Sequence, residues 1–231
     1  MPGIRSIGGT GGSSTSVTAQ TIPATSVAGD VAYFVIVQGG GQTITQSASN
    51  GGTWSTSSAL QAWNSTTSRT TIYKKVLTAA DCTGSVTVGA TFAGSQIWSA
   101  ALFIVQDAND ATTVISAPLV KSTSSTTDTF NPVTPPAPGS LVVCVDGGHL
   151  SASNATAMTH TTPSGYTALV DISQSGTIQH TGLAVWTRQM GNSVASETPG
   201  SVTVSPAAAR EMALVFAFPP AQRESWGMLA A

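Results

Sequence analysis

Two segments of this chain, "GDVAYFVIVQGGG" at 29–41 and "GSLVVCVDGG" at 139–148, follow one design: a turn with glycine, an apolar run rich in β-branched residues, and a glycine stop. Short apolar runs bounded by glycine are typical of buried β-strands. A strand pattern that recurs after about 110 residues suggests that the whole chain is built twice.

Four further pairs of segments support this interpretation, and they keep the same order in both halves. They are "GGTW" (51–54) with "SGY" (164–166), "TTIYKKV" (70–76) with "LAVWTRQ" (183–189), "GSVTV" at both 84–88 and 200–204, and "ALFIV" (101–105) with "ALVFA" (213–217). Order and spacing together predict an internal duplication, with pseudo-repeats at about 17–110 and 117–220.

The predicted elements are all strands. Runs such as "SVTAQTI", "RTTIYKKVL" and "IWSAALFIV" are separated by Gly, Pro, Asn and Ser clusters, and no long window has a helical stripe. Five or six strands per repeat cannot bury both faces of a sheet alone, so the sheets must pack on each other. We therefore expect an all-β, antiparallel β-sandwich, jelly-roll-like. Either both halves build one large sandwich or each closes its own; one compact body is favoured.

The two ends of the chain have different compositions from this body, which spans 17–220. Residues 1–16 are rich in Gly, Ser and Thr, as in a flexible N-terminal arm, and 221–231 form a C-terminal tail. If the arm is ordered, neighbouring subunits must supply its contacts. The apolar residues expected to make partner contacts at the two ends are Ile4, Ile7, Trp226, Met228 and Leu229.

Charge and hydropathy limit the possible partners. Only 8% of the 231 residues are charged, and the net charge is −2, so no basic stripe for nucleic acid is present. No apolar run reaches the length of a membrane helix, and the first residues lack the apolar core of a signal peptide, so neither a membrane nor a Sec pathway is expected. Of the two cysteines, Cys82 and Cys144, free thiols are favoured over a bridge.

No group of residues matches a catalytic or metal-binding motif. His149, His160 and His180 are spaced by 11 and 20 residues, which is no zinc pattern on one element, although loops can bring distant ligands together. The segment "QDANDA" at 106–111 lacks the central glycine of a calcium loop, so an Asx-type turn is favoured. The sequence therefore predicts no catalytic residue, no cofactor and no metal.

The aromatic residues have two possible roles, a sugar-stacking platform or core packing. Tyr73 and Trp186 occupy equivalent places in the two repeats, as do Trp54 and Tyr166, which favours packing. Trp63 and Trp226 have no counterpart, so we expect these two at surface contacts.

The order of these phrases resembles a family of tailed-bacteriophage virion proteins. The turn "GD" before an apolar strand, then "GGTWS" or "SGYTA", "IYKKVLTAAD", "GSVTV" and an Ala-rich strand running into "VQDAND" are similar to the family pattern "GDLLV…GWT…YYKVA…GS.TVT…AAL.AYRGVD". The similarity covers about 17–218, and the motifs are structural. "GS" replaces "GD" in the second half, and "QDAND" replaces "RGVD".

The resemblance implies a non-enzymatic structural role in a phage particle that is assembled in the host bacterial cytoplasm. The expected function is that of a capsid decoration (cement) protein, bound to the major capsid protein or to tail proteins and to copies of itself. The alternatives are a minor tail or baseplate protein and a carbohydrate-binding host-recognition module.

Overall fold

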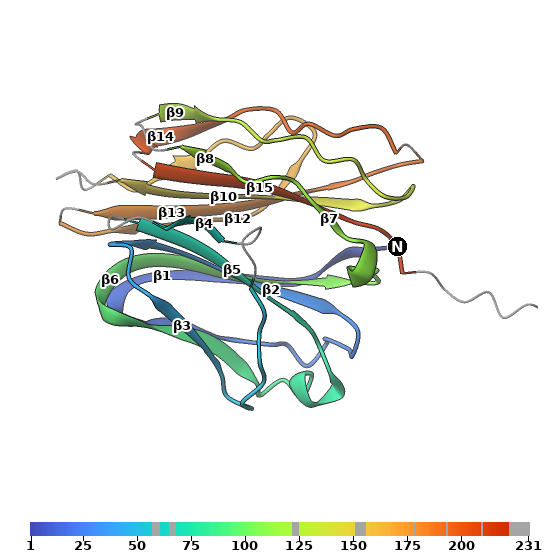
Figure 1. The fold of residues 1–231 in the computed structure, drawn as a ribbon, viewed down its shortest axis with the longest axis horizontal. Coiled ribbons are helices and arrows are strands. Elements are labelled where there is room, and N and C mark those ends of the chain that lie inside the picture. Colours follow the sequence, from blue (N-terminus) through green and yellow to red (C-terminus); the bar gives the residue numbers. More distant parts are fainter. Residues whose placement is uncertain are drawn as a thin grey trace, which may run out of the picture.

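The structure is a computed structural model that describes residues 1–56, 61–64, 68–121, 125–150, 156–177, 179–192, 194–208 and 210–221, with the backbone alone at 61–64 and 210–211. Its sheets are stacked in layers, with those of the second half lying on the first half (Figure 1). All strand pairs are antiparallel, so the predicted all-β antiparallel sandwich is confirmed.

The first half contains β1 (Gly3–Thr21), β2 (Val31–Gly39), β3 (Ile44–Ala48), β4 (Gln61–Asn64), β5 (Ser68–Val76), the 3₁₀ turn η1 (Ala79–Asp81) and β6 (Thr87–Gln106). The second half contains η2 (Asp110–Thr112), β7 (Val114–Ile115), β8 (Leu119–Lys121), β9 (Ser125–Asp128), β10 (Leu141–Leu150), β11 (Thr159–His160), β12 (Thr167–Ser175), β13 (His180–Gln189), β14 (Val202–Ala208) and β15 (Arg210–Phe218). Among the described residues, no helix is long and apolar enough to cross a membrane.

A central core lies between the main sheets of the two halves. Alternate residues of β2, such as Val31, Tyr33 and Val35, point into it, as do Leu141 and Val143 of β10. The segments "AYFVIV", "LVVCV", "ALFIV" and "ALVFAF" are at most 4% exposed, as expected for strands covered on both faces. The two halves are therefore joined by a continuous apolar layer.

Each half also covers the outer face of its own main sheet. The long strand β6 takes part in two layers. Its second part, from Ile97 onward, pairs with β2 in the main sheet. Its first part, up to Phe92, pairs with β3 in the outer layer. In the second half, a separate sheet in the order β11-β14-β9 covers the outer face. The structure thus combines both expected arrangements: each half has its own outer core, and the two halves share the central one.

The strand orders of the two main sheets correspond. The first sheet runs β1-β6-β2-β5-β4 and the second, read from its other edge, runs β7-β15-β10-β13-β12. Gly29 and Gly139, at φ +95° and +71°, enter β2 and β10 through the left-handed region that favours glycine. These features agree with the predicted duplication, which stays a prediction, as does the jelly-roll connectivity.

The registers also correct one of the sequence matches. Val31 pairs with Val105, and Leu141, at the matching place in the repeat, pairs with Phe218. Val105 therefore corresponds to Phe218, whereas matching "ALFIV" with "ALVFA" is displaced by one residue. A displacement of one residue exchanges the two faces of a strand, but both segments are apolar on both faces, so the sequence pattern contained no signal for the register.

The prediction of a flexible arm at 1–16 is wrong, because residues 3–16 belong to β1. This strand pairs with β6 along most of its length, from Gly3–Gln106 to Thr21–Thr87. The glycines permit close packing: a Cβ at Gly9 would lie 2.1 Å from Cδ1 of Ile172 in β12, and a Cβ at Gly12 would lie 2.6 Å from Cζ2 of Trp98. This segment has the composition of a flexible linker, but it forms a strand. Its glycines let neighbouring side chains pack directly on the backbone from both faces.

Because Val35 is fully buried in the central core, Val35→Asp places an unpaired charge there. We expect a loss of at least about 3 kcal/mol in the free energy of unfolding, measured by urea denaturation. Val76→Asp is the control, since Val76 lies on the neighbouring strand β5 but is 44% exposed. Equal stability of the two variants would contradict the placement of the core.

Gly12→Val tests whether the N-terminal residues belong to the body. The new side chain must displace the fully buried indole of Trp98, so we expect a loss of about 1–3 kcal/mol and a lower melting temperature. Gly94→Val is the control, because a Cβ at Gly94 has no atom within 4 Å. An unchanged melting temperature for Gly12→Val would mean that β1 does not pack on Trp98.

Candidate functional site

The three histidines are held inside the fold. His149 and His180 are buried, and burial lowers the pKa of His180, which favours its neutral form. His160 Nδ1 lies 2.8 Å from Asp171 Oδ1, and its ring meets Trp186 edge-on. Among the residues that the structure describes, no group of three or more His, Cys, Asp or Glu side chains has a metal-binding arrangement.

Both thiols are free, as predicted, and neither is activated. Burial raises the pKa of the Cys144 thiol strongly. Burial also raises the pKa of Cys82, and the nearby carboxylates Asp30 and Asp81 raise it further. Because the thiolate is the reactive form of cysteine, these surroundings disfavour nucleophilic chemistry at either residue.

Most basic side chains in the described chain are paired with an acid. The ion pairs are Arg5–Asp30 (2.5 Å), Lys74–Asp110 (2.8 Å), Lys75–Asp81 (2.6 Å), Lys121–Asp128 (2.7 Å) and Arg188–Glu197 (2.8 Å). In four of these pairs the acid is nearly or fully buried, and in all five the charges are matched within the chain. The outer surface therefore presents hydroxyl and amide groups and little unpaired charge.

Asp81 is the most densely bonded of these acids. It accepts hydrogen bonds from Lys75 Nζ at 2.6 Å, from Asn50 Nδ2 at 2.8 Å, and from the amide and hydroxyl of Thr78 at 2.8 Å each. Burial raises the pKa of Asp81, but these donors outweigh that effect and hold the pKa well below its ordinary value. The carboxylate closes the turn η1 and is structural.

The acidic segment at 106–111 also forms a turn, as predicted. The Asn109 side chain accepts a hydrogen bond from the amide of Ala111 at 3.2 Å and so caps η2. The adjacent Asp110 binds Lys74 of β5. The turn ties the segment between the two halves to the first sheet.

The aromatic side chains that the structure describes lie in the cores. Trp98 and Trp186 are 1% exposed, and Trp54, Tyr73 and Tyr166 are at most 9% exposed. The expected role in packing is confirmed for Trp54, Tyr73, Tyr166 and Trp186. Trp98 packs in the same way, and none of the five forms a platform for sugars. The side chain of Trp63 lies outside the described residues, although its backbone belongs to β4.

The expected partner contacts have different outcomes at the two ends. Ile4 and Ile7 are partly buried against the central core of their own chain, and their contact with another subunit stays a prediction. The β-bulge between Ile4 and Ser6 places both isoleucines on the same face of β1. Trp226, Met228 and Leu229 lie outside the described residues.

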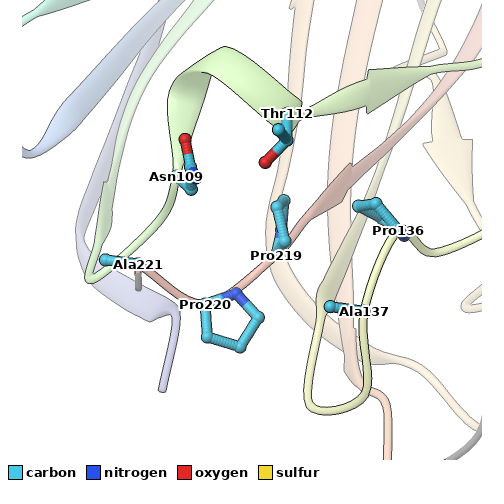
Figure 2. A pocket seen from close by; sticks show the side chains of 7 residues that line it. All are labelled: Asn109, Thr112, Pro136, Ala137, Pro219, Pro220 and Ala221. Atoms are coloured by element: carbon cyan, nitrogen blue, oxygen red, sulfur yellow. The ribbon is translucent and has the colours of Figure 1, made fainter. Parts of the chain in front are cut away.

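A hollow of about 410 Å³ lies at the end of the body where β15 stops (Figure 2). Figure 2 shows the rings of Pro136, Pro219 and Pro220 around it, with Asn109 and Thr112 on another side. A second hollow of about 380 Å³ shares Pro220 and Ala221 with the first; its other lining residues are Met1, Pro138, Gly139 and Asn192. No acidic, basic or nucleophilic side chain apart from the Thr112 hydroxyl lines either hollow.

Backbone hydrogen bonds hold the walls of these hollows in place. The amide of Asn109 donates to the carbonyl of Pro219 at 3.0 Å, and the amide of Ala221 donates to Asp107 at 2.7 Å. This surface was not predicted from the sequence, since its two proline segments, "TPPAPG" and "FPPA", are some 80 residues apart. The available signal was that each segment flanks a buried strand, β10 or β15, at an end where the two strands meet.

This arrangement offers shape and apolar ring surface, but no acid–base pair and no activated nucleophile. We therefore regard the end of the body that carries both hollows as a candidate contact surface, which we call the proline end (Pro136, Pro138, Pro219 and Pro220).

Asp81→Asn tests the structural role of this carboxylate. The pKa of Asp81 is lower in the folded chain than its ordinary value of 3.8, so its stabilising contribution is complete above pH 3.8 and is lost as the pH falls further. We expect the variant to lose about 1–3 kcal/mol at pH 7 in urea unfolding, with the difference from wild type shrinking below pH 3.8. The control is Asp107→Asn, because the Asp107 side chain is 51% exposed. Its free energy of unfolding should equal that of wild type both at pH 7 and below pH 3.8.

Comparison with known proteins gave no relative: no family model, no curated protein and no solved structure matches this chain.

Proposed function

We propose that this protein is a structural component of a tailed-bacteriophage particle, and that it decorates the capsid shell. The resemblance of its strand motifs to virion proteins is the starting point of the proposal. The observation that carries it furthest is the internal matching of charge, because five of the basic side chains are neutralised within the chain.

Charge matching suits a protein that is packed beside many identical neighbours. Like charges repeated across a lattice repel one another, whereas hydroxyl and amide groups form hydrogen bonds to neighbours without long-range repulsion. The same matching leaves few free basic groups for nucleic acid among the described residues. A particle-bound, non-catalytic role is consistent with both features.

The proline end is the surface that we propose for attachment to the particle. Met1 and Ala221 line the same hollow there, and Ala221 is followed by the segment that contains Trp226, Met228 and Leu229. Large apolar residues and proline rings are the components of contact surfaces that bury apolar area. The major capsid protein is the proposed partner.

A minor tail or baseplate protein is the closest alternative, and copy number distinguishes the two. We expect quantitative mass spectrometry of purified virions to find the protein at a copy number comparable with that of the major capsid protein. A handful of copies per particle would instead place it in the tail or baseplate. Absence from purified virions would contradict the whole proposal.

A host-recognition module that binds carbohydrate is the second alternative. All twelve aromatic side chains that the structure describes are buried, so stacking on a sugar would depend on Trp63 or Trp226. Binding of the purified protein to a glycan array, lost in Trp63→Ala or Trp226→Ala, would favour this alternative over decoration.

A further inference from the structure

The two sides of the stacked main sheets end in very different edge strands. On one side the last strands are β1 of the first sheet and β12 of the second. On the other side they are β4, β7 and β8, which have four, two and three residues. Edge strands carry unpaired N–H and C=O groups, so their length determines how much main chain is open to pairing.

The short side has the features that prevent pairing between molecules. Its described strands are brief, and β4 has a register shift between Ala62 and Asn64. Short strands and irregular pairing are among the usual protections of sheet edges. Over the described residues, this side of the molecule therefore offers little main chain for strand addition.

The β1 side has none of these protections over nine consecutive residues. From Ser6 to Ser14 the pairing with β6 is free of register shifts, and the segment contains no proline and no charged residue. The nearest charge, Arg5, is bound to Asp30 on the same sheet. Among the described strands, only β6 pairs with β1, so the outer edge of this segment is available.

The edge of β12 lies beside that of β1. Cβ atoms at Gly9 and Gly11 would lie 2.1 Å from Ile172 and 2.9 Å from Gln174, which are both in β12. The one charged residue of β12, Asp171, is held by His160, whose Nδ1 and backbone amide lie 2.8 and 3.0 Å from its two carboxylate oxygens. Two strand edges therefore run along the same side of the molecule, and the β1 edge is uncharged from Ser6 to Ser14.

From this contrast we infer that the β1 edge, Ser6–Ser14, is a self-association surface that pairs antiparallel with the same segment of a second copy. A two-fold axis normal to the sheets brings the two β1 strands together and extends the first sheet across both molecules. The same operation brings the β12 edges to the same side of the interface.

The chemistry of the edge favours a second copy over another peptide. Peptides that add to a sheet edge gain specificity from pockets for their side chains, and the glycine-rich segment from Gly8 to Gly12 offers none. Self-pairing needs no such pockets, and Ser6–Ser14 has no charged residue that would lie opposite a like charge in the second copy. The inference goes beyond the proposed role in a particle, since it concerns the free protein.

The test is the mass of the full chain at micromolar concentration, measured by sedimentation and light scattering. We expect a dimer. Gly8→Lys and Ser13→Lys place a positive charge at exposed positions of the edge in each copy, and a Cβ at Gly8 has only Gln20 Oε1 nearby, at 3.4 Å. At low salt, the dimer dissociation constant of each variant should be at least tenfold higher than that of wild type. High salt should lower it part of the way back, because it screens the repulsion.

Val194→Lys is the matched control, because Val194 is 47% exposed and lies outside both edge strands. It should remain a dimer. A monomeric wild-type protein would overturn the inference, as would dimers that persist in both edge variants or dissociate equally in the control.

Hydrogen exchange gives a second measurement that needs no variant. Amides of Ser6–Ser14 should become more protected as wild-type protein is concentrated, whereas amides of β4 should not change. Unchanged protection in β1 would also overturn the inference. The virion experiment above is independent of these results, so failure of one proposal is distinguishable from failure of the other.

Discussion

The aromatic contact between the two main sheets is the interaction on which the rest of the structure depends. The ring of Tyr33 in β2 meets those of Phe216 and Phe218 in β15 edge-on, with centroids 5.0 and 5.4 Å apart, and stacks on Phe103. Each half covers the outer face of its main sheet with its own strands, but it has nothing to cover the inner face. The two inner faces must therefore cover each other, which makes the double sandwich one body.

Apolar contact alone does not fix how one sheet is oriented on the other, since it is non-directional. Polar and steric details provide that direction. Ser99 Oγ of β6 lies 2.9 Å from Thr181 Oγ1 of β13, and Lys74 binds Asp110 at the junction of the halves. Gly147 permits close approach, because a Cβ there would lie 2.6 Å from Val37 of the other sheet. Such contacts are satisfied in a single relative placement of the sheets.

Much of the fold was predictable from patterns with a period of two residues. Alternating and continuous apolar runs identified the strands, and the repeated glycine turns predicted a correspondence between β2 and β10. The register between β6 and β15 was not predictable, because segments that are apolar on both faces look alike after a shift of one residue. The proline end was missed for another reason: its two segments are distant in sequence and meet only because β10 pairs with β15.

The sequence by itself determined the strand class, the free thiols and the packing role of most aromatic residues, since these follow from local pattern and composition. The tertiary structure decided whether the N-terminal residues form a flexible arm or a strand. "GGTGG" has the composition of a linker, yet it forms part of β1, because the absence of side chains lets this strand pack closely against Trp98 on one face and Ile172 on the other. Only the position of β12 and Trp98 in space distinguishes a glycine that allows flexibility from a glycine that allows close contact.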